Sequence, residues 1–278
     1  MAGAERAGRR GGPAVTAAPA PRIASLVPSI TELLVALGLR PWLVARTGFC
    51  IHPAEAVADV PKIGGTKDVN LDKLRRLAPS HVIVNVDENR IDTAEAVRAF
   101  VPDVIVTHPQ GPQDNAALID QLLARFGHLP GVQARGEALK RGLAQALQDI
   151  RGKTWPPRRV LYLIWKDPWM SVARDTYIAR MLAEVGWQTW PEAEGGDTGA
   201  ARYPAIRGDE PWLAHIDEVL LSSEPYSFGE RHVAEAQALC PQARVRLVDG
   251  ELLSWYGPRA AAGLHYLMEL RGWTSSSP

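Results

Sequence analysis

A long amphipathic segment near the middle of the chain constrains the fold more than any other feature. Between Val132 and Ile150, Leu139, Leu143 and Leu147 recur every four residues, with charged residues between them. This spacing predicts a single helix of about 18–20 residues, roughly 28 Å long at 1.5 Å per residue. The segment KTWPPRR that follows would end it. We therefore expect a bridging helix, within residues 131–152, that divides the chain into two halves.

Short apolar runs alternate with helical patterns on both sides of this helix. Strands are expected at 22–27, 43–47, 81–86, 104–107, 160–165, 218–222 and 244–248. Helices are expected at 30–37, 70–77, 93–100, 114–126, 176–186, 211–216, 230–239 and 258–271. This alternation predicts an α/β fold, with two Rossmann-like lobes of mainly parallel sheet joined by one long helix. The lobes would span 22–130 and 153–273, flanked by a disordered leader (1–21) and a tail (274–278).

Local signals add detail at the ends of the first helices. Ser29, followed by Glu32 three residues later, forms a capping-box pattern that predicts a helix starting near Ile30. Gly38 would end this helix. Asn70 is expected to cap the helix that Pro79 terminates.

Composition excludes several classes of protein. The 31 basic and 31 acidic residues balance, which argues against a nucleic-acid partner. No apolar stretch approaches the ~20 residues of a membrane span. Cys50 and Cys240 could form one disulfide, but two unpaired thiols is the simpler interpretation. The pair Arg9-Arg10 suggests twin-arginine export, yet no apolar segment follows it, so the sequence as written does not support export unless its start is misplaced.

Catalytic motifs are missing from the chain. There is no G-x-S-x-G, P-loop or H-E-x-x-H pattern. None of the seven histidines lies four residues from another on an expected helix, so no dedicated zinc site is predicted. The sequence therefore favours a binding protein over an enzyme, without a cofactor of its own.

Aromatic residues instead gather in loops that follow expected strands. Since the carboxyl ends of parallel strands meet at one edge, these loops should face each other across a cleft and suit a wide, flat, partly apolar ligand. The candidate ligand-binding aromatics are Phe49, Trp165, Trp169, Tyr226, Phe228, Trp255 and Tyr256. The alternative is that they pack the lobe interior, for which Trp165, at the end of an apolar strand, is the strongest case.

Polar residues in two of these loops are further candidates. Glu88 or Arg90 would grip a polar or anionic group of the ligand, unless their segment is only a solvated turn. Cys50 and His52 lie on one loop and could supply a soft or imidazole ligand to a metal. Two candidates on one loop are too few to define a metal site.

The chain resembles a known class of proteins along nearly its whole length. Arg22–Glu32, Lys62–Leu74 and Pro79–Val84 resemble the opening of the iron-chelate and cobalamin class of ABC-transporter substrate-binding proteins, or helical-backbone metal receptors. Further blocks look like a cobalamin-binding-protein-like branch: Thr47–Pro53, Asp87–Arg90, Tyr162–Pro168, Ser222–Tyr226, Val248–Glu251 and Ser254–Gly257.

The resemblance implies a partner and a location. Members carry one acidic docking residue per lobe that meets arginines on a permease, and the matching positions here are Asp72 and either Asp209 or Glu210. Both positions also suit the start of a helix, which favours acidic residues anyway. The class works in the periplasm with a signal peptide or lipid anchor; neither is seen here, so a cytoplasmic protein is the alternative.

Three functions are compatible with the sequence. The first is a monomeric protein that binds a corrinoid or a ferric siderophore and delivers it to an ABC importer. The second is an enzyme of corrinoid or chelate metabolism on the same fold, because a fold does not determine function. The third is an intracellular protein that handles or senses the chelate.

Overall fold

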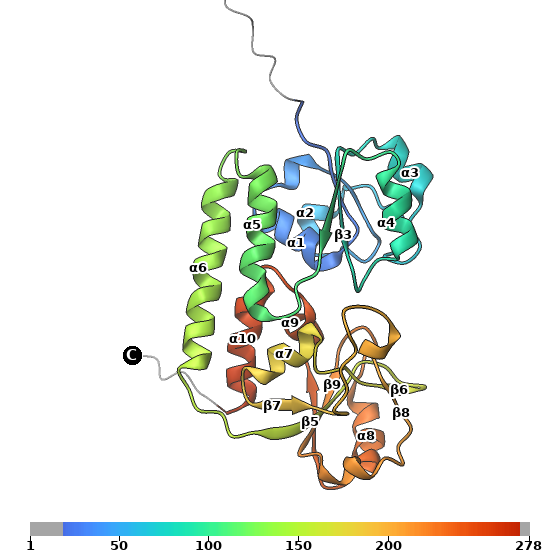
Figure 1. The fold of residues 1–278 in the computed structure, drawn as a ribbon, viewed down its shortest axis with the longest axis vertical. Helices are drawn as coiled ribbons and strands as arrows, with labels where there is room; N and C mark the ends of the chain where they lie inside the picture. Colours follow the sequence, from blue (N-terminus) through green and yellow to red (C-terminus); the bar gives the residue numbers. More distant parts are fainter. Residues whose placement is uncertain (1–18, 273–278) are drawn as a thin grey trace, which may run out of the picture.

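A computed structural model describes residues 19–272 of the chain. The disordered leader and tail expected from the sequence lie outside these residues, apart from positions 19–21. Two lobes follow one another along the long axis of the molecule, and a single long helix runs beside both (Figure 1). Among residues 19–272, no helix is long and apolar enough to cross a bilayer.

Lobe 1 is built on a four-stranded parallel sheet in the order β2-β1-β3-β4. Its strands are β1 (Ile23–Ser25), β2 (Leu43–Arg46), β3 (His81–Asn85) and β4 (Asp103–Thr107). Its helices are α1 (Pro28–Ala36), α2 (Ala54–Val57), α3 (Leu71–Arg76), α4 (Ile91–Arg98) and α5 (Asn115–Phe126), with short 3-10 turns η1 (Arg40–Trp42) and η2 (Pro112–Asp114). The apolar runs that predicted the strands are buried in this sheet.

Lobe 2 repeats this arrangement with a second parallel sheet in the order β10-β9-β5-β7. Its strands are β5 (Arg158–Leu163), β7 (Trp187–Thr189), β9 (Glu218–Ser222) and β10 (Arg244–Val248); β6 (Trp169–Met170) and β8 (Ala205–Ile206) form a separate antiparallel pair. Its helices are α7 (Tyr177–Ala183), α8 (Val233–Leu239), α9 (Gly250–Ser254) and α10 (Arg259–Leu270), with 3-10 turns η3 (Ala200–Arg202), η4 (Pro211–His215) and η5 (Glu230–His232). The predicted fold class, two parallel α/β lobes, is therefore confirmed.

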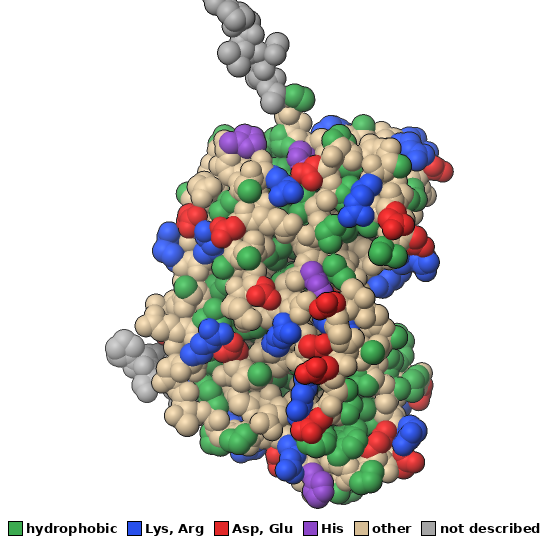
Figure 2. Space-filling view, viewed as in Figure 1, with side chains coloured by type: hydrophobic (Ala, Val, Ile, Leu, Met, Phe, Trp, Pro, Cys, Tyr) green, Lys and Arg blue, Asp and Glu red, His purple; other side chains and the backbone are tan. Residues whose placement is uncertain are grey.

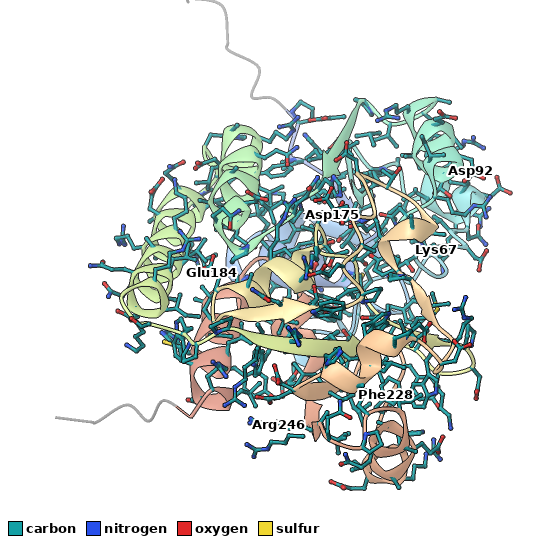
Figure 3. All side chains as sticks on the ribbon, turned by 60° about the horizontal axis from the view of Figure 1, so that its bottom comes forward. Lys67, Asp92, Asp175, Glu184, Phe228 and Arg246 are labelled. Carbon is teal, nitrogen blue, oxygen red and sulfur yellow. The ribbon has the colours of Figure 1, made fainter. Side chains whose placement is uncertain are left out.

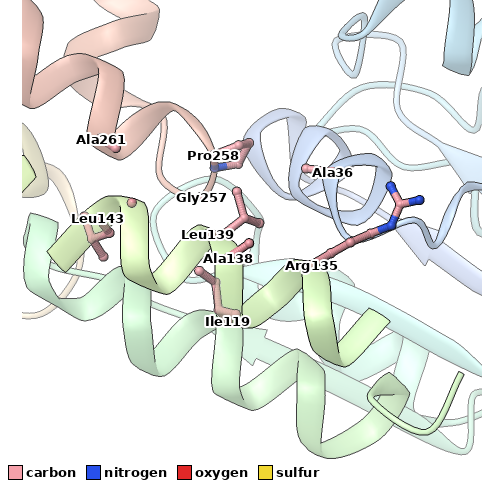
Figure 4. Close-up of a pocket in the computed structure, with 10 residues that line it drawn as sticks. Ala36, Ile119, Arg135, Ala138, Leu139, Leu143, Gly257, Pro258 and Ala261 are labelled. Atoms are coloured by element: carbon pink, nitrogen blue, oxygen red, sulfur yellow. The ribbon is translucent and has the colours of Figure 1, made fainter. Parts of the chain in front are cut away.

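The long helix α6 (Val132–Arg151) packs against α5 of lobe 1 and α10 of lobe 2. It buries Leu143, Ala146 and Ile150, on the face that the leucine spacing predicted. Where α6 passes between the lobes it borders a cavity of about 330 Å³ (Figure 4). Apolar side chains including Leu139 line this cavity, and Arg135 extends from it towards the end of α1.

Two details differ from the sequence-based expectation. The helix α1 begins at Pro28, so Val27 is the N-cap and the expected Ser29 cap does not form. Proline suits the first helical position because its φ is already helical and it lacks an N–H that would need a partner. Glu32, the other residue of the expected capping box, instead pairs with Arg259 of lobe 2 at 2.6 Å.

The cysteines do not form a disulfide. Cys50 lies in lobe 1 and Cys240 in lobe 2, and both are buried free thiols. The simpler interpretation of the two cysteines is thus confirmed.

Candidate functional site

The carboxyl ends of strands from both lobes meet where the lobes touch. In lobe 1 these are the ends of β2 and β3, which lead into the loops carrying His52 and Glu88. In lobe 2 they are the ends of β5, β9 and β10. Loops at this edge of parallel sheets are where α/β proteins bind ligands. Residues of these loops therefore form the candidate site.

Three polar side-chain contacts cross between the lobes at this edge. The Tyr256 hydroxyl donates a hydrogen bond to Glu88 Oε1 at 2.6 Å. Arg202 Nε lies 3.0 Å from Asp87 Oδ1, and His52 Nε2 lies 3.3 Å from Glu251 Oε1. We call these residues the seam: His52, Asp87 and Glu88 from lobe 1, and Arg202, Glu251 and Tyr256 from lobe 2.

Two aromatic side chains beside the seam are exposed to solvent. Phe49 of lobe 1 is 63% exposed, and Trp165 of lobe 2 is 42% exposed. The Phe49 ring lies against Gly65, where an added Cβ would come within 3.3 Å of the ring. Trp165 packs its edge against Tyr226, with ring centroids 5.5 Å apart. Exposed rings of this size, one on each lobe, are candidates for contact with a ligand.

A line of contacts connects these two aromatics through Trp255. His52, three residues after Phe49, meets the Trp255 ring at 5.6 Å between centroids. The Trp255 indole N–H donates to Glu224 Oε2 at 2.6 Å, and Glu224 lies two residues before Tyr226. Trp255 itself is buried. It therefore positions the neighbouring loops more than it offers a surface to a ligand.

The remaining lobe 2 aromatics form one cluster behind Trp165. The rings of Trp169 and Phe228 stack with centroids 5.9 Å apart and an interplanar angle of 7°. Tyr226 lies 4.7 Å from Phe228, and its hydroxyl is 3.3 Å from His232 Nε2. Phe228 is buried and Trp169 is partly buried, so these rings hold Tyr226 and Trp165 in place.

Carboxylates dominate the electrostatics of the seam. Burial raises the pKa of Glu88 to about 7; the hydrogen bond from Tyr256 opposes this rise, and the nearby carboxylate of Glu224 adds to it. Burial likewise raises the pKa of Glu224, against the hydrogen bond from Trp255. The guanidinium of Arg259 is held by Glu32 and Glu251 and lies 4.6 Å from the centre of the Trp255 ring.

Comparison with known proteins decides the family. The model of the family described as periplasmic binding protein matches residues 23–205. The chain belongs to this family. It is a solute-binding protein and not an enzyme.

Individual relatives of this binding protein span most of its length. The uncharacterized ABC transporter substrate-binding lipoprotein YvrC of Bacillus subtilis is 24% identical over 265 residues, covering 89% of this chain and 79% of its own. A vitamin B12-binding protein of Vibrio vulnificus is 24% identical over 221 residues, covering 79% of this chain and 74% of its own.

Solved structures share the fold. The periplasmic vitamin B12 binding protein BtuF of Vibrio cholerae superimposes with a TM-score of 0.73 at 20% identity, covering 91% of this chain and 97% of its own. The periplasmic heme binding protein HutB of the same organism gives 0.72 at 20% identity, covering 91% and 99%.

Two residues that the sequence suggested for ligand or metal binding, Arg90 and Cys50, lie away from the seam. Arg90 is exposed and pairs with Asp92 at 2.7 Å. Asp92 lies at the outer edge of lobe 1 (Figure 3). The two residues are only two positions apart, so this pairing is easier for Arg90 than reaching the other lobe. Cys50 is buried in lobe 1, with Sγ 3.1 Å from Thr47 Oγ1, while His52 faces lobe 2. The structure therefore does not bring Cys50 and His52 together.

A metal centre has no support in the described part of the chain. Residues 19–272 contain no group of three or more His, Cys, Asp or Glu side chains that could hold an ion. Burial also raises the pKa of the Cys50 thiol, which disfavours the thiolate that a metal would need.

The acidic residues suggested for docking lie on the surface. The Asp72 side chain, in α3, is 80% exposed, and that of Asp209, before η4, is 75% exposed. Glu210 differs, because its carboxylate accepts the backbone N–H groups of Arg207 and Gly208, each at 2.8 Å. Asp72 and Asp209 thus offer one accessible acid on each lobe.

Several residues in or beside the seam could not be identified from sequence alone. Arg202, Glu251 and Arg259 find partners more than a hundred residues away or in a neighbouring loop, and no local pattern marks them. Glu224 lies within a loop that was singled out only for its aromatics. A carboxylate two residues before a prospective ligand aromatic, Tyr226, is the signal that could have indicated it.

Proposed function

We propose that this binding protein captures a bulky metal chelate, a corrinoid or a ferric chelate, beside the seam and delivers it to an ABC importer. The observation that carries the proposal is the exposure of Phe49 and Trp165 on opposite lobes. A wide, flat ligand between the loops would cover both rings, and burial of a large apolar side chain contributes about 1.5–3 kcal/mol. The relatives named for binding vitamin B12 and heme support this ligand class.

The remaining candidate aromatics would support the binding surface without forming most of it. Tyr226 and Trp169 would back the Trp165 ring, and Trp255 and Tyr256 would hold the loops on which His52 and Glu88 lie. Arg90 has no part in it, because its guanidinium is engaged by Asp92 away from the seam.

Titration of the purified protein tests the proposal. Cyanocobalamin, haemin and ferric siderophores are added in turn, and tryptophan fluorescence should be quenched by at least one of them, saturating at one equivalent. We expect Phe49→Ala and Trp165→Ala each to weaken binding about tenfold, which corresponds to about 1.4 kcal/mol. Isothermal calorimetry measures the affinities.

Matched controls lie on the opposite edges of the same sheets. Phe100 follows α4 and precedes β4, and Trp212 lies in η4 before β9. Phe100→Ala and Trp212→Ala should leave affinity unchanged. If no chelate of the panel binds, or if the control variants lose as much affinity as the site variants, the proposed function is wrong.

Docking to the importer is proposed to use the exposed acids Asp72 and Asp209, one from each lobe. Their separation from the seam means that they can change without affecting the ligand. The double variant Asp72→Lys/Asp209→Lys should bind the chelate normally when purified but support less chelate uptake by cells. Uptake requires the protein to act outside the cytoplasmic membrane, which cell fractionation checks. Normal uptake by the double variant would exclude these two residues as docking sites.

A further inference from the structure

Three carboxylates lie close together beside the exposed aromatics. Glu88 comes from lobe 1, and Glu224 and Glu251 come from lobe 2. The negative charge of Glu224 acts on Glu88, and that of Glu251 acts on Glu224. A ligand that covers Phe49 and Trp165 would therefore meet an acidic surface between them.

Two of these carboxylates have an oxygen to spare. Glu88 uses Oε1 for the Tyr256 hydroxyl, and Glu224 uses Oε2 for the Trp255 indole. Within residues 19–272, no hydrogen bond reaches the second oxygen of either group. Glu251 differs, since one of its oxygens faces His52 and the other binds Arg259. Glu88 and Glu224 can thus each accept a further hydrogen bond from a ligand.

The neighbouring arginines are already engaged by protein acids. Arg259 binds Glu32 and Glu251. Arg202 is 1% exposed and binds Asp87, and Arg90 binds Asp92. Lys67 is the nearby cation that remains exposed, and its ammonium donates to the Asp87 backbone carbonyl at 2.9 Å. Among residues 19–272, none of these arginines is left free to form the fork that recognises a ligand carboxylate.

We infer that Glu88 and Glu224 select the ligand by charge, admitting a neutral or cationic chelate with amide N–H donors at its rim and excluding one with carboxylates there. Carboxylate oxygens accept strong hydrogen bonds from amide donors. An anionic rim would be repelled by like charges in a partly buried site, where screening is weak. This inference rests on the proposed function, because it concerns the same site.

The test compares chelates of different charge at pH 8, where Glu88, whose pKa burial raises to about 7, is ionised. Cyanocobalamin carries amides at its rim and no free carboxylate, whereas haemin carries two propionates. We expect wild-type protein to bind cyanocobalamin at least about a hundredfold more tightly than haemin. In Glu88→Gln/Glu224→Gln the negative charges are gone but the acceptors for Tyr256 and Trp255 remain. Haemin should then bind at least about tenfold more tightly than it binds the wild type.

A surface variant serves as the control, and the possible outcomes separate a failure of the charge selection from a failure of the proposed function. Glu137→Gln, on the exposed side of α6, removes one negative charge far from the seam and should change neither affinity. Circular dichroism confirms that each variant is folded. If haemin binds wild-type protein as tightly as cyanocobalamin, or if the double variant keeps the same preference, the charge selection is wrong while the proposed function stands. If neither chelate nor any ferric siderophore binds, the proposed function itself fails.

Discussion

The two lobes share one sheet topology but differ in what they attach to it. Taken in chain order, the first strand of each lobe lies between the second and the third, and the fourth lies at the edge. In lobe 1 a short turn joins β3 to α4. In lobe 2 long loops follow β5 and β7 and include the β6–β8 pair. The common sheet follows from common apolar runs, whereas the site depends on loops added to it.

The loops also give the lobes different tasks at the seam. Lobe 1 supplies one exposed ring, Phe49, and the acids Asp87 and Glu88. Lobe 2 supplies the aromatic cluster around Trp165 and the buried cation Arg202, which crosses to Asp87. On this comparison, lobe 2 supplies more of the aromatic side chains near the junction, and Arg202 links it to lobe 1. The ribbon shows that the lobes meet about midway along the molecule (Figure 1). In the space-filling view, acidic and basic side chains are interspersed on the visible face (Figure 2).

The largest effect is expected from breaking the buried ion pair between the lobes. Arg202→Ala removes a cation and leaves Asp87 without its closest partner, and such a loss costs about 3 kcal/mol of unfolding free energy. Urea denaturation measures it. Arg207→Ala is the control, because its pair with Asp209 is exposed and should contribute no more than about 0.5 kcal/mol. Equal losses in the two variants would show that the Arg202 pair does not stabilise the junction.

A double-mutant cycle sharpens this result. Asp87→Asn alone should also destabilise the protein, and adding Arg202→Ala should cost less than the sum of the two single changes, because both remove the same interaction. Full additivity would mean that Arg202 and Asp87 act independently. A contact other than the Arg202–Asp87 pair would then have to hold the two lobes together.

Much of the fold was predictable because it depends on local patterns. The run HVIVNV gave β3, the leucine spacing gave α6, and Asn70 caps α3 by accepting the backbone N–H of Lys73. Short strands such as β6 and β8 were missed, since two residues carry no periodicity. The capping box at Ser29 was wrong because Pro28 starts the helix one position earlier.

The candidate site was less predictable because it depends on contacts between distant segments. The sequence placed Glu88 and Tyr256 in loops at the correct edge, but their mutual hydrogen bond joins residues 168 positions apart. Arg90 looked equivalent to Glu88 in the same turn, yet it points outward to Asp92. A sequence pattern thus predicts which loops meet, whereas the side-chain pairing depends on how the lobes pack.

A smaller effect is expected from Glu88 of lobe 1, through the pH dependence of the free energy of unfolding. Because the pKa of Glu88 is raised to about 7, the folded protein holds a proton there that the unfolded chain releases near pH 4.5. Glu88 therefore contributes stability that is fully present below pH 4.5 and is lost as the pH rises to about 7. Each pKa unit corresponds to about 1.4 kcal/mol, and partial exposure reduces the total to about 1–2 kcal/mol.

Urea denaturation of wild-type protein and Glu88→Gln at several pH values isolates this contribution. The groups that act on Glu88 are Tyr256, Glu224, Lys67 and Asp87, and all remain in the variant. Relative to wild type, Glu88→Gln should gain stability between pH 4.5 and 7 and change little above that range. Glu137→Gln should follow the wild-type curve throughout. Parallel curves for wild type and Glu88→Gln would show that the pKa of Glu88 is not raised in the folded protein. Burial of this carboxyl at the junction would then not affect stability.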